Sequence, residues 1–406
     1  MGWYGGLGAR LVYASRMQPG IVQPAATVDK TTRMVSCQWH NPILLAIPAT
    51  WVSVIYMVKL FASNGDVRYA SFVVRNDANH APLIFQAAIM AYQAYNAFGG
   101  YSLYSGLEYP GTGNPTMTYA DRAYVVSFDR PHTANVYAGL GPQARWELNF
   151  VPWLEKRGYN MSYLTDIDTD QNPSLLIGHK LIVFAGHDEY WSTAMRQNVT
   201  NARNAGVSLA FFVANDVYWH ARLGTSPLGP GRLVICYRDT TLDPLAASTP
   251  SEATVRWRDA PLNNSEDSLL GERYLNETAS NTVTPLVLGA GAQSLLAETG
   301  YSVGIQIPNV VGGEVDAVVA PVSVPALTTL AASQVSCLPS VICPTGAAIT
   351  ANTTIYTWTN GARVFDAGTF YWVTRLYDRY PSPLTFALTP RPGFERFTEN
   401  ILSYLL

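Results

Sequence analysis

Charged residues are scarce in this sequence of 406 residues, since Asp, Glu, Lys and Arg together make up only 14% of it. Hydrophobic residues make up 48%, which excludes a disordered chain and predicts a large core. The net charge of −3 offers no basic surface for nucleic acid or an anionic membrane, and neither is expected as a partner. No apolar run reaches the roughly 20 residues that a membrane-spanning helix needs.

Cysteine is also rare. The four cysteines are too few for the disulfide framework of a small secreted domain. Cys337 and Cys343 lie in a polar, proline-containing loop, where a local disulfide and two free thiols are equally expected. The first residues lack the basic region and the apolar stretch of a signal peptide, and we expect further sequence upstream of them. The compartment, secreted or cytoplasmic, stays open.

The first 77 residues have the pattern of β structure. Apolar residues alternate along one face of a predicted strand over 54–60. Asn64-Gly65 is a hairpin turn signal, and residues 68–75 predict the returning strand. We expect a partial β-sandwich domain over residues 1–77.

Strands and helices alternate from residue 78 onward. Strands are predicted over residues 83–90, 159–165, 180–185, 207–214 and 233–237, several of them continuous apolar runs typical of strands buried on both faces. Helices are predicted over 141–157 and 192–205. This repetition predicts an α/β domain over residues 78–406 with a mostly parallel, doubly wound sheet. Segments near 240–285 and 320–360, rich in Pro, Ser, Thr, Ala and Asn, are expected to be loop insertions.

The candidate site residues follow the predicted strands, because ligands of a parallel sheet bind beyond the carboxyl ends of its strands. Gly186 to Trp191 is the sharpest signal, since it joins a buried strand to a helix as in the elbow that exposes a nucleophile in α/β hydrolases. The segment carries no Ser or Cys, so acyl-enzyme chemistry is not expected. His187 and Glu189 can instead bind a metal or act as acid and base. The alternative is that the helix dipole favours acidic residues here.

Other polar residues at the strand ends carry weaker signals. Asp166, Asp168 and Asp170 resemble a calcium loop but lack its Gly and its later Glu, so a solvated loop is favoured. Asn215 ends a buried strand, where an amide commonly satisfies backbone groups. Tyr56 falls on the core face of its strand, and its residue pattern alone favours packing over ligand binding.

Six stretches of the sequence stand out as motifs: Gly2 to Arg10, Tyr92 to Gly100, Val126 to Pro131, Gly186 to Trp191, Ala214 to Trp219 and Val311 to Asp316. Together they resemble the large (β) subunit family of N,N-dimethylformamidase over nearly the whole chain. The resemblance implies a catalytic domain similar to class I glutamine amidotransferases and ThuA-like proteins, without their cysteine. It also implies a homo-oligomer or a small partner subunit.

The resemblance implies a mononuclear iron site as well. In the characterised amidase, two tyrosines and one glutamate hold the iron. Glu189 matches the glutamate, Tyr95 matches one tyrosine by motif, and Tyr56 matches the second by spacing and strand context. A phenol ligates only when deprotonated, which requires a strongly polarising cation such as Fe(III).

Four further residues receive catalytic roles from the resemblance. His187 and Asn215 would flank the bound water and the substrate. Arg238 stands near the place of a lysine of that enzyme, and an arginine keeps the charge but cannot transfer a proton. Glu314 would supply a further carboxylate.

The expected function is a metal-dependent hydrolase that cleaves a small amide or a related C–N bond with a metal-activated water. Two alternatives stay open. The 24 tyrosines and 10 tryptophans would also suit a non-catalytic carbohydrate-binding or cell-surface protein. The second alternative is a ThuA-like sugar-modifying enzyme with a different metal.

Overall fold

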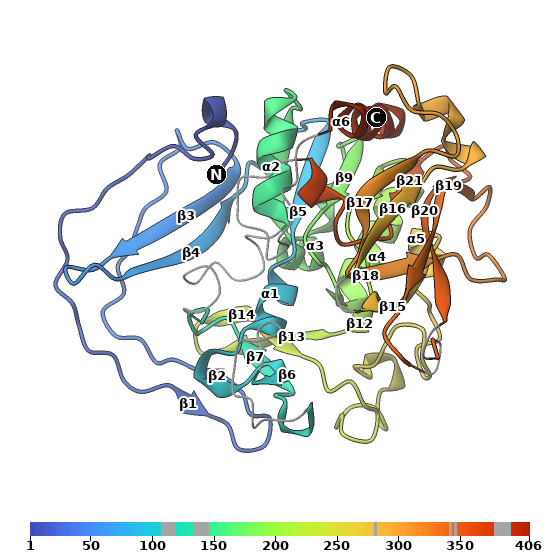
Figure 1. The fold of residues 1–406 in the computed structure, drawn as a ribbon. Helices are drawn as coiled ribbons and strands as arrows, with labels where there is room; N and C mark the ends of the chain where they lie inside the picture. The colour runs from blue at the N-terminus through green and yellow to red at the C-terminus, as the bar shows by residue number, and fades with distance from the viewer. Residues whose placement is uncertain (107–118, 134–145, 280–281, 341–342, 345–346, 377–390) are drawn as a thin grey trace.

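A seven-stranded sheet forms the centre of the protein (Figure 1), seen in a computed structural model that describes residues 1–106, 119–133, 146–279, 282–340, 343–344, 347–376 and 391–406. The strands are ordered β19 (Thr328–Ser336), β20 (Ala348–Thr357), β21 (Arg363–Asp366), β11 (Ser208–Phe211), β9 (Leu181–Phe184), β5 (Leu83–Ala87) and β8 (Met161–Thr165). The last five run parallel, while β19 and β20 are antiparallel. The prediction of an α/β fold with a mostly parallel sheet is confirmed.

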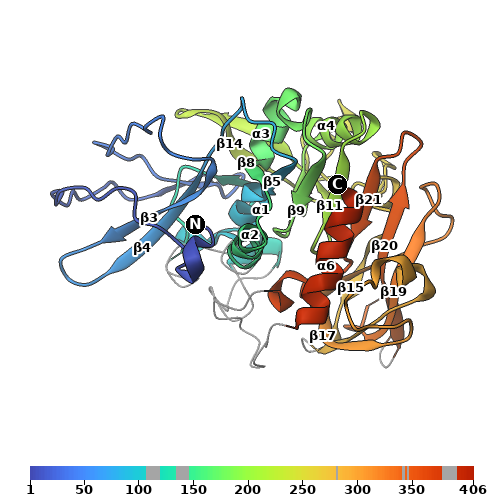
Figure 2. The same cartoon turned by 90° about the horizontal axis from the view of Figure 1, so that it is seen from above.

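The parallel strands are buried on both faces because nearly all their residues are apolar. In β9, Leu181 and Val183 belong to one hydrophobic core, and Ile182 and Phe184 belong to the other. Figure 2 shows the two layers of helices around this sheet. One face carries α2 (Glu147–Lys156) and α6 (Pro392–Leu405), and the other carries α1 (Ile89–Tyr95), α3 (Asp166–Gln171) and α4 (Thr193–Asn204).

Two of these helices differ from the sequence expectation. The acidic run at residues 166–170 is not a solvated loop but part of α3, which begins with a capping box between Thr165 and Asp168. The predicted helix over 141–157 begins at Glu147, and residues 141–145 lie outside the described part of the chain. Helix α4 agrees with its prediction and is capped by the Ser192 hydroxyl.

Residues 1–77 form two separate antiparallel pairs rather than the expected partial sandwich. One pair is β1 (Thr27–Val28) with β2 (Val35–Ser36), and the other is β3 (Val54–Phe61) with β4 (Val67–Val74), joined by the predicted Asn64-Gly65 turn. The start of β3 packs into the same hydrophobic core as the central sheet, which takes the place of a second sandwich layer. A domain boundary at residue 77 stays a prediction.

Short antiparallel sheets flank the central sheet. They pair β15 (Arg273–Glu277) with β18 (Glu314–Ala317), β16 (Val283–Val287) with β17 (Gln306–Gly312), and β13 (Arg222–Ser226) and β7 (Val125–Ser127) with β14 (Gly229–Ile235). A short parallel pair joins β10 (Tyr190–Trp191) to β12 (Trp219–His220). Strand β6 (Leu103–Gly106), helix α5 (Asp267–Leu270) and short 3-10 turns at Tyr4–Gly6, Phe98–Gly100, Tyr119–Asp121, Pro173–Leu176, Pro250–Glu252, Ala290–Leu295 and Val373–Arg375 complete the described elements.

Two further sequence expectations are corrected here. The strand predicted at 233–237 lies in β14, outside the parallel sheet, and β21 is the fifth parallel strand instead. The segment near 320–360 is not a loop insertion, because it supplies β19 and β20 of the central sheet. Threonine favours strands, and four threonines lie in β20.

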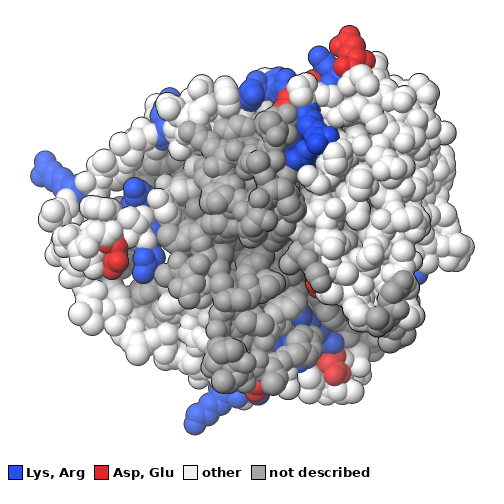
Figure 3. Space-filling model, viewed as in Figure 1, with Lys and Arg blue, Asp and Glu red and all other residues white. Residues whose placement is uncertain are grey.

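The disulfide, the lengths of the helices and the surface charge complete the description of the fold. Cys337 and Cys343 form a disulfide across six residues of sequence. None of the described helices is both long and apolar enough to span a bilayer. On the right of Figure 3, the described surface carries few charged side chains.

Candidate active site

The candidate site lies where β5 and β9 end. In chain order the five parallel strands are arranged 2-1-3-4-5, so the order reverses between β5 and β9, and doubly wound sheets bind ligands at such a switch point. Tyr95 is the last residue of α1, which follows β5 after one residue, and His187 and Glu189 lie in the loop after β9. The two strand ends that the sequence singled out are therefore neighbours in the sheet.

The loop after β9 is held tightly by its surroundings. A Cβ atom at Gly186 would lie 2.5 Å from the Tyr92 hydroxyl oxygen and 2.6 Å from Glu147 Oε1, so only glycine fits there. The backbone carbonyl of Glu189 accepts a hydrogen bond from the amide of Trp219 at 2.8 Å. The amide of Asp188 donates to Asp216 Oδ1 at 2.8 Å. These contacts fix the direction of the His187 and Glu189 side chains.

Two phenols converge on one carboxylate oxygen. The Tyr95 hydroxyl donates to Glu189 Oε2 at 2.9 Å, and the Tyr104 hydroxyl donates to the same oxygen at 2.5 Å. The two tyrosine rings stack with centroids 4.3 Å apart. Tyr104 belongs to β6, so the three side chains whose oxygens meet here come from three separate segments of the chain.

A histidine, an amide and a second carboxylate surround this cluster. His187 Nε2 lies 3.1 Å from the Tyr95 hydroxyl oxygen, 3.5 Å from Glu189 Oε2 and 3.7 Å from Glu314 Oε2. Asn215 Nδ2 lies 3.5 Å from Glu189 Oε1, at the limit of a hydrogen bond. The ring of His187 packs edge-on against Phe370 with centroids 4.7 Å apart.

Arg238 reaches the cluster from the end of β14. Its guanidinium carbon lies 3.8 Å from the centroid of the Tyr104 ring and 4.7 Å from that of Trp219. One of its terminal nitrogens donates to the Tyr190 hydroxyl. The arginine thus places a positive charge against the face of the phenol whose hydroxyl contacts Glu189.

Burial and neighbouring charge raise the pKa values of Tyr95, Tyr104 and Glu314. Burial raises the pKa of Tyr95 well above its ordinary value, and the carboxylates of Glu189 and Glu314 add to the rise. Burial likewise raises the pKa of Tyr104, although the charge of Arg238 opposes this. The pKa of Glu314 is raised by burial and then by Glu189. Without a bound cation, the phenols are therefore neutral hydrogen-bond donors.

The backbone beside the site is strained. Asn215, Val217 and Arg238 adopt φ angles of 62°, 57° and 61°, in the left-handed region that non-glycine residues rarely adopt. The β-branched Val217 is the strongest outlier of the three. Strain of this kind is retained where the surroundings enforce it, and it clusters at functional sites.

Six of the seven residues named from the sequence come together in this cluster. The seventh, Tyr56, lies elsewhere: its hydroxyl donates to the carbonyl of Val52 at 3.0 Å, and its ring stacks on Trp51 and Phe72. The structure instead places Tyr104 beside Tyr95 and Glu189. A sequence signal for Tyr104 is its position, nine residues after Tyr95 and four after the end of the Tyr92 to Gly100 motif.

The chemistry of the donors fits a hard cation. Tyr95, Tyr104 and Glu189 offer only oxygen ligands, which suit Fe(III) rather than a soft metal. Glu314 Oε2 is buried and accepts no hydrogen bond from the described residues, so an acceptor remains for a cation or a ligand N–H. Among the described residues, no group of three or more His, Cys, Asp or Glu side chains is arranged to hold a metal. Tyrosine oxygens fall outside that set.

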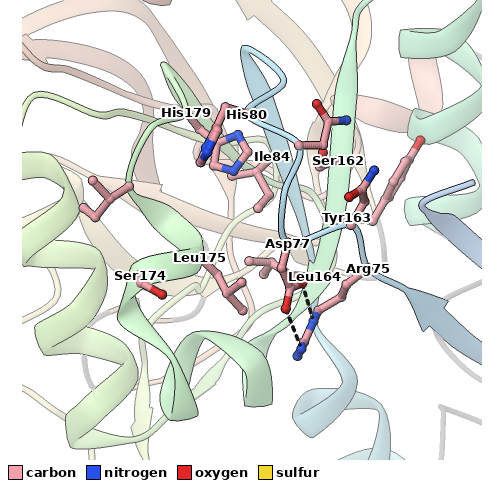
Figure 4. Close-up of a pocket in the computed structure, with 13 residues that line it drawn as sticks. Arg75, Asp77, His80, Ile84, Ser162, Tyr163, Leu164, Ser174, Leu175 and His179 are labelled. Carbon is pink, nitrogen blue, oxygen red and sulfur yellow. Dashed lines mark hydrogen bonds and ion pairs between the residues drawn. The ribbon is translucent and has the colours of Figure 1, made fainter.

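A second hollow, shown in Figure 4, lies beside β8 and near the residues that lead into β5 and β9, at the other end of these two strands from the cluster around Glu189. Its lining includes His80 and His179, from segments that lead into β5 and β9, and the Arg75–Asp77 ion pair. Its volume of about 20 Å³ is close to that of one water molecule. Its size and its position both make it a weaker candidate than the cluster around Glu189.

The fold and the cluster define a class of protein: an α/β protein with an oxygen-rich polar site at the switch point of its parallel sheet. The chain belongs to the family described as N,N-dimethylformamidase beta subunit-like, C-terminal, whose family model matches residues 1–382. No curated protein matches the chain in sequence.

Proposed function

We propose that the protein is a metal-dependent hydrolase that cleaves a small amide or a related C–N bond. The observation that carries the proposal is the convergence of Tyr95 and Tyr104 on Glu189 at the switch point, in a member of this family. We propose these three residues as the ligands of one Fe(III) ion, with Tyr104 in place of Tyr56. The glutamine amidotransferase-like and ThuA-like character of the domain is part of the same proposal.

A bound Fe(III) would supply the positive charge that lowers the pKa of a water molecule and polarises an amide carbonyl. The chain's own residues position and move protons around it. His187 Nε2 lies within 3.7 Å of Tyr95, Glu189 and Glu314 oxygens, which lets it pass a proton to the departing amine. Asn215 Nδ2 can orient the substrate carbonyl or the water.

Glu314 and Arg238 have supporting roles in this proposal. Glu314 is largely buried with a raised pKa, so it can hold a proton near the reacting atoms at neutral pH. The charge of Arg238 opposes the rise that burial causes in the pKa of Tyr104, and it would stabilise the phenolate that a metal requires.

A partner chain is also proposed, because the family is named for a subunit. Large apolar side chains are exposed in the N-terminal segment, including Val22 at 98%, Met17 at 93% and Leu44 at 88%. Exposed apolar surface of this kind is typical of protein–protein contacts. The partner is a second copy of the chain or a small separate subunit, and the mass of the complex in solution distinguishes them.

Iron analysis and an amidase assay on the purified full chain test the proposed function. We expect about one iron per chain, a visible phenolate-to-iron absorption band, and release of amine from N,N-dimethylformamide or a related small amide. Glu189→Ala should lose the iron, the band and the activity, whereas the exposed control Glu298→Ala should keep all three. A colourless, metal-free protein that binds glycans would instead favour a carbohydrate-binding protein. Full iron in Glu189→Ala would contradict the assigned ligands.

A further inference from the structure

A pocket with two buried arginines lies along α4, apart from the candidate active site. Its volume is about 220 Å³, several times the roughly 30 Å³ that one water molecule occupies in the liquid. Arg196 and Arg203 line it from α4, and Trp257 and Ser268 line it from the segment around α5. No Asp or Glu is among its described lining residues, and it shares no residue with the cluster around Glu189.

Arg196 is 4% exposed, yet its hydrogen bonds go only to neutral groups. Its Nη2 donates to Asn264 Oδ1 at 3.0 Å, to the carbonyl of Ser265 at 2.7 Å and to the Ser268 hydroxyl at 2.9 Å. Its Nη1 is buried and has no acceptor among the described residues. Its guanidinium also lies over the Trp257 ring, 4.7 Å from the centroid. Burial lowers the pKa of Arg196 to about 9, which expresses how poorly its charge is solvated.

Arg203, seven residues after Arg196 in α4, repeats this pattern. It is 3% exposed, and its nitrogens donate to the Tyr356 hydroxyl, the carbonyl of Ser268 and Asn204 Oδ1. Its guanidinium carbon lies 3.7 Å from the centroid of the Trp358 ring. The two like charges also act on each other, since Arg203 contributes to the lowered pKa of Arg196.

The carboxylate whose charge acts on Arg196 does not pair with either arginine. Asp267 raises the pKa of Arg196 through its charge, but its carboxylate accepts from the Ser323 hydroxyl at 3.2 Å. In the described part of the chain, no carboxylate oxygen lies within the 4.0 Å that defines an ion pair with either guanidinium. Buried charges in proteins are usually paired, because an unpaired charge loses its hydration without compensation.

We propose that this pocket binds a small oxyanion of the phosphate type. Guanidinium groups hold phosphate and carboxylate through charge-assisted hydrogen bonds, often with two parallel N–H donors. Among the remaining lining residues, Thr200 adds a hydroxyl of the kind that completes an oxyanion site. The Thr193 hydroxyl already contacts His220 Nε2 at 3.0 Å, and Gln197 Nε2 donates to Asn201 Oδ1 at 2.8 Å. The site is independent of the proposed hydrolase chemistry, and its failure or success leaves that proposal unchanged.

The alternative reading is that both arginines only attach α4 to the neighbouring segments through neutral hydrogen bonds. The two readings differ in what happens when phosphate is added. An arginine with a purely structural role gives no specific response to phosphate at constant ionic strength, whereas a binding site is saturated and stabilised by it.

Calorimetric titration of the full chain with inorganic phosphate, at an ionic strength held constant with chloride, tests the proposal. We expect saturable binding tighter than about 1 mM and a phosphate-dependent rise in Tm. Arg196→Gln and Arg203→Gln should each weaken binding by about tenfold to a hundredfold, because a charge-assisted hydrogen bond is lost. Arg196→Lys keeps the charge and should retain part of the affinity. The matched control Arg396→Gln, which replaces an exposed arginine of α6, should bind like the parent protein.

The proposal is tested by comparing phosphate binding by the parent protein with phosphate binding by the arginine variants. Saturable binding that is lost in both glutamine variants, and retained in Arg396→Gln, supports the site. Absence of binding in the parent protein overturns it, as does equal binding in all variants. If Arg196→Gln fails to fold, Arg203→Gln and Arg196→Lys carry the comparison, since each leaves the other guanidinium in place.

Discussion

Replacing Tyr104 or Tyr56 by phenylalanine distinguishes the proposed metal ligands, which include Tyr104, from those expected from the sequence, which include Tyr56. Tyr104→Phe removes a hydroxyl that lies 2.5 Å from Glu189 Oε2. Its ring contacts, the stack on Tyr95 and the contact with Arg238, remain, so the fold should be kept. Tyr56→Phe removes a hydroxyl that donates to the carbonyl of Val52 at 3.0 Å.

The two changes should cost similar stability but differ in their effect on metal. A hydrogen bond to a charged group contributes about 1.5–3 kcal/mol, and Tyr95 still donates to the same Glu189 oxygen, so Tyr104→Phe should cost about 1.5 kcal/mol. Tyr56→Phe loses a neutral hydrogen bond and should cost about 1 kcal/mol. Loss of a group that merely supports a ligand weakens metal binding roughly 10–100-fold, so loss of the ligand Tyr104 should weaken iron binding by at least about a hundredfold.

The assay combines iron content per chain, the visible phenolate band and the free energy of unfolding in urea. Tyr104→Phe should lose iron and the band while it keeps a cooperative unfolding transition. Tyr56→Phe should keep both iron and the band. The opposite result, iron retained in Tyr104→Phe and lost in Tyr56→Phe, would refute the ligand assignment and restore the one drawn from sequence.

Two further predictions concern stability. The pKa of Glu272 is raised by complete burial and by Asp316, so the folded state keeps a proton that the unfolded state releases above the ordinary pKa of 4.5. The free energy of unfolding should therefore fall as the pH rises above about 4.5. Glu272→Gln should flatten this fall when urea unfolding is compared at pH 5 and pH 8. Gly186→Ala should cost about 1–3 kcal/mol in the same assay, since its Cβ would overlap Glu147 Oε1, while Gly20→Ala, with open space around it, should be near neutral. Equal slopes for Glu272→Gln and the parent, or equal stability of both alanine variants, would contradict these expectations.

The parallel strands were predictable from sequence because burial on both faces leaves a local signature. Leu181 to Phe184 and Ser208 to Phe211 are nearly all apolar, and each is followed by a turn. The edge of the sheet was not predictable in this way. Strand β20 is rich in threonine and alanine, and such a run is typical of both strands and loops until its partner is known. Residues 233–237 were wrongly expected in the central sheet, because an apolar run predicts a strand but not the sheet that the strand joins.

Some residues of the candidate site could likewise be predicted from the local sequence, and others could not. His187 and Glu189 follow β9 within five residues, and Tyr95 ends the short helix that follows β5, so the rule that strand ends carry sites identified them. Tyr104 lies in the short strand β6, outside the central sheet, and only the fold shows that its ring stacks on Tyr95. Tyr56 had suitable spacing, but its strand belongs to a hairpin, and its hydroxyl is turned toward Val52.

The arginine at position 238 determines how the proposed reaction divides its proton transfers. A lysine in that place could release a proton, whereas a guanidinium ordinarily keeps its proton and its charge near neutral pH. The structure uses that fixed charge, since Arg238 lies over the Tyr104 ring and donates to the Tyr190 hydroxyl. A constant charge there favours the Tyr104 phenolate, which opposes the effect of burial on its pKa. Proton transfer to the leaving amine then falls to His187, which contacts Tyr95 and lies beside both carboxylates.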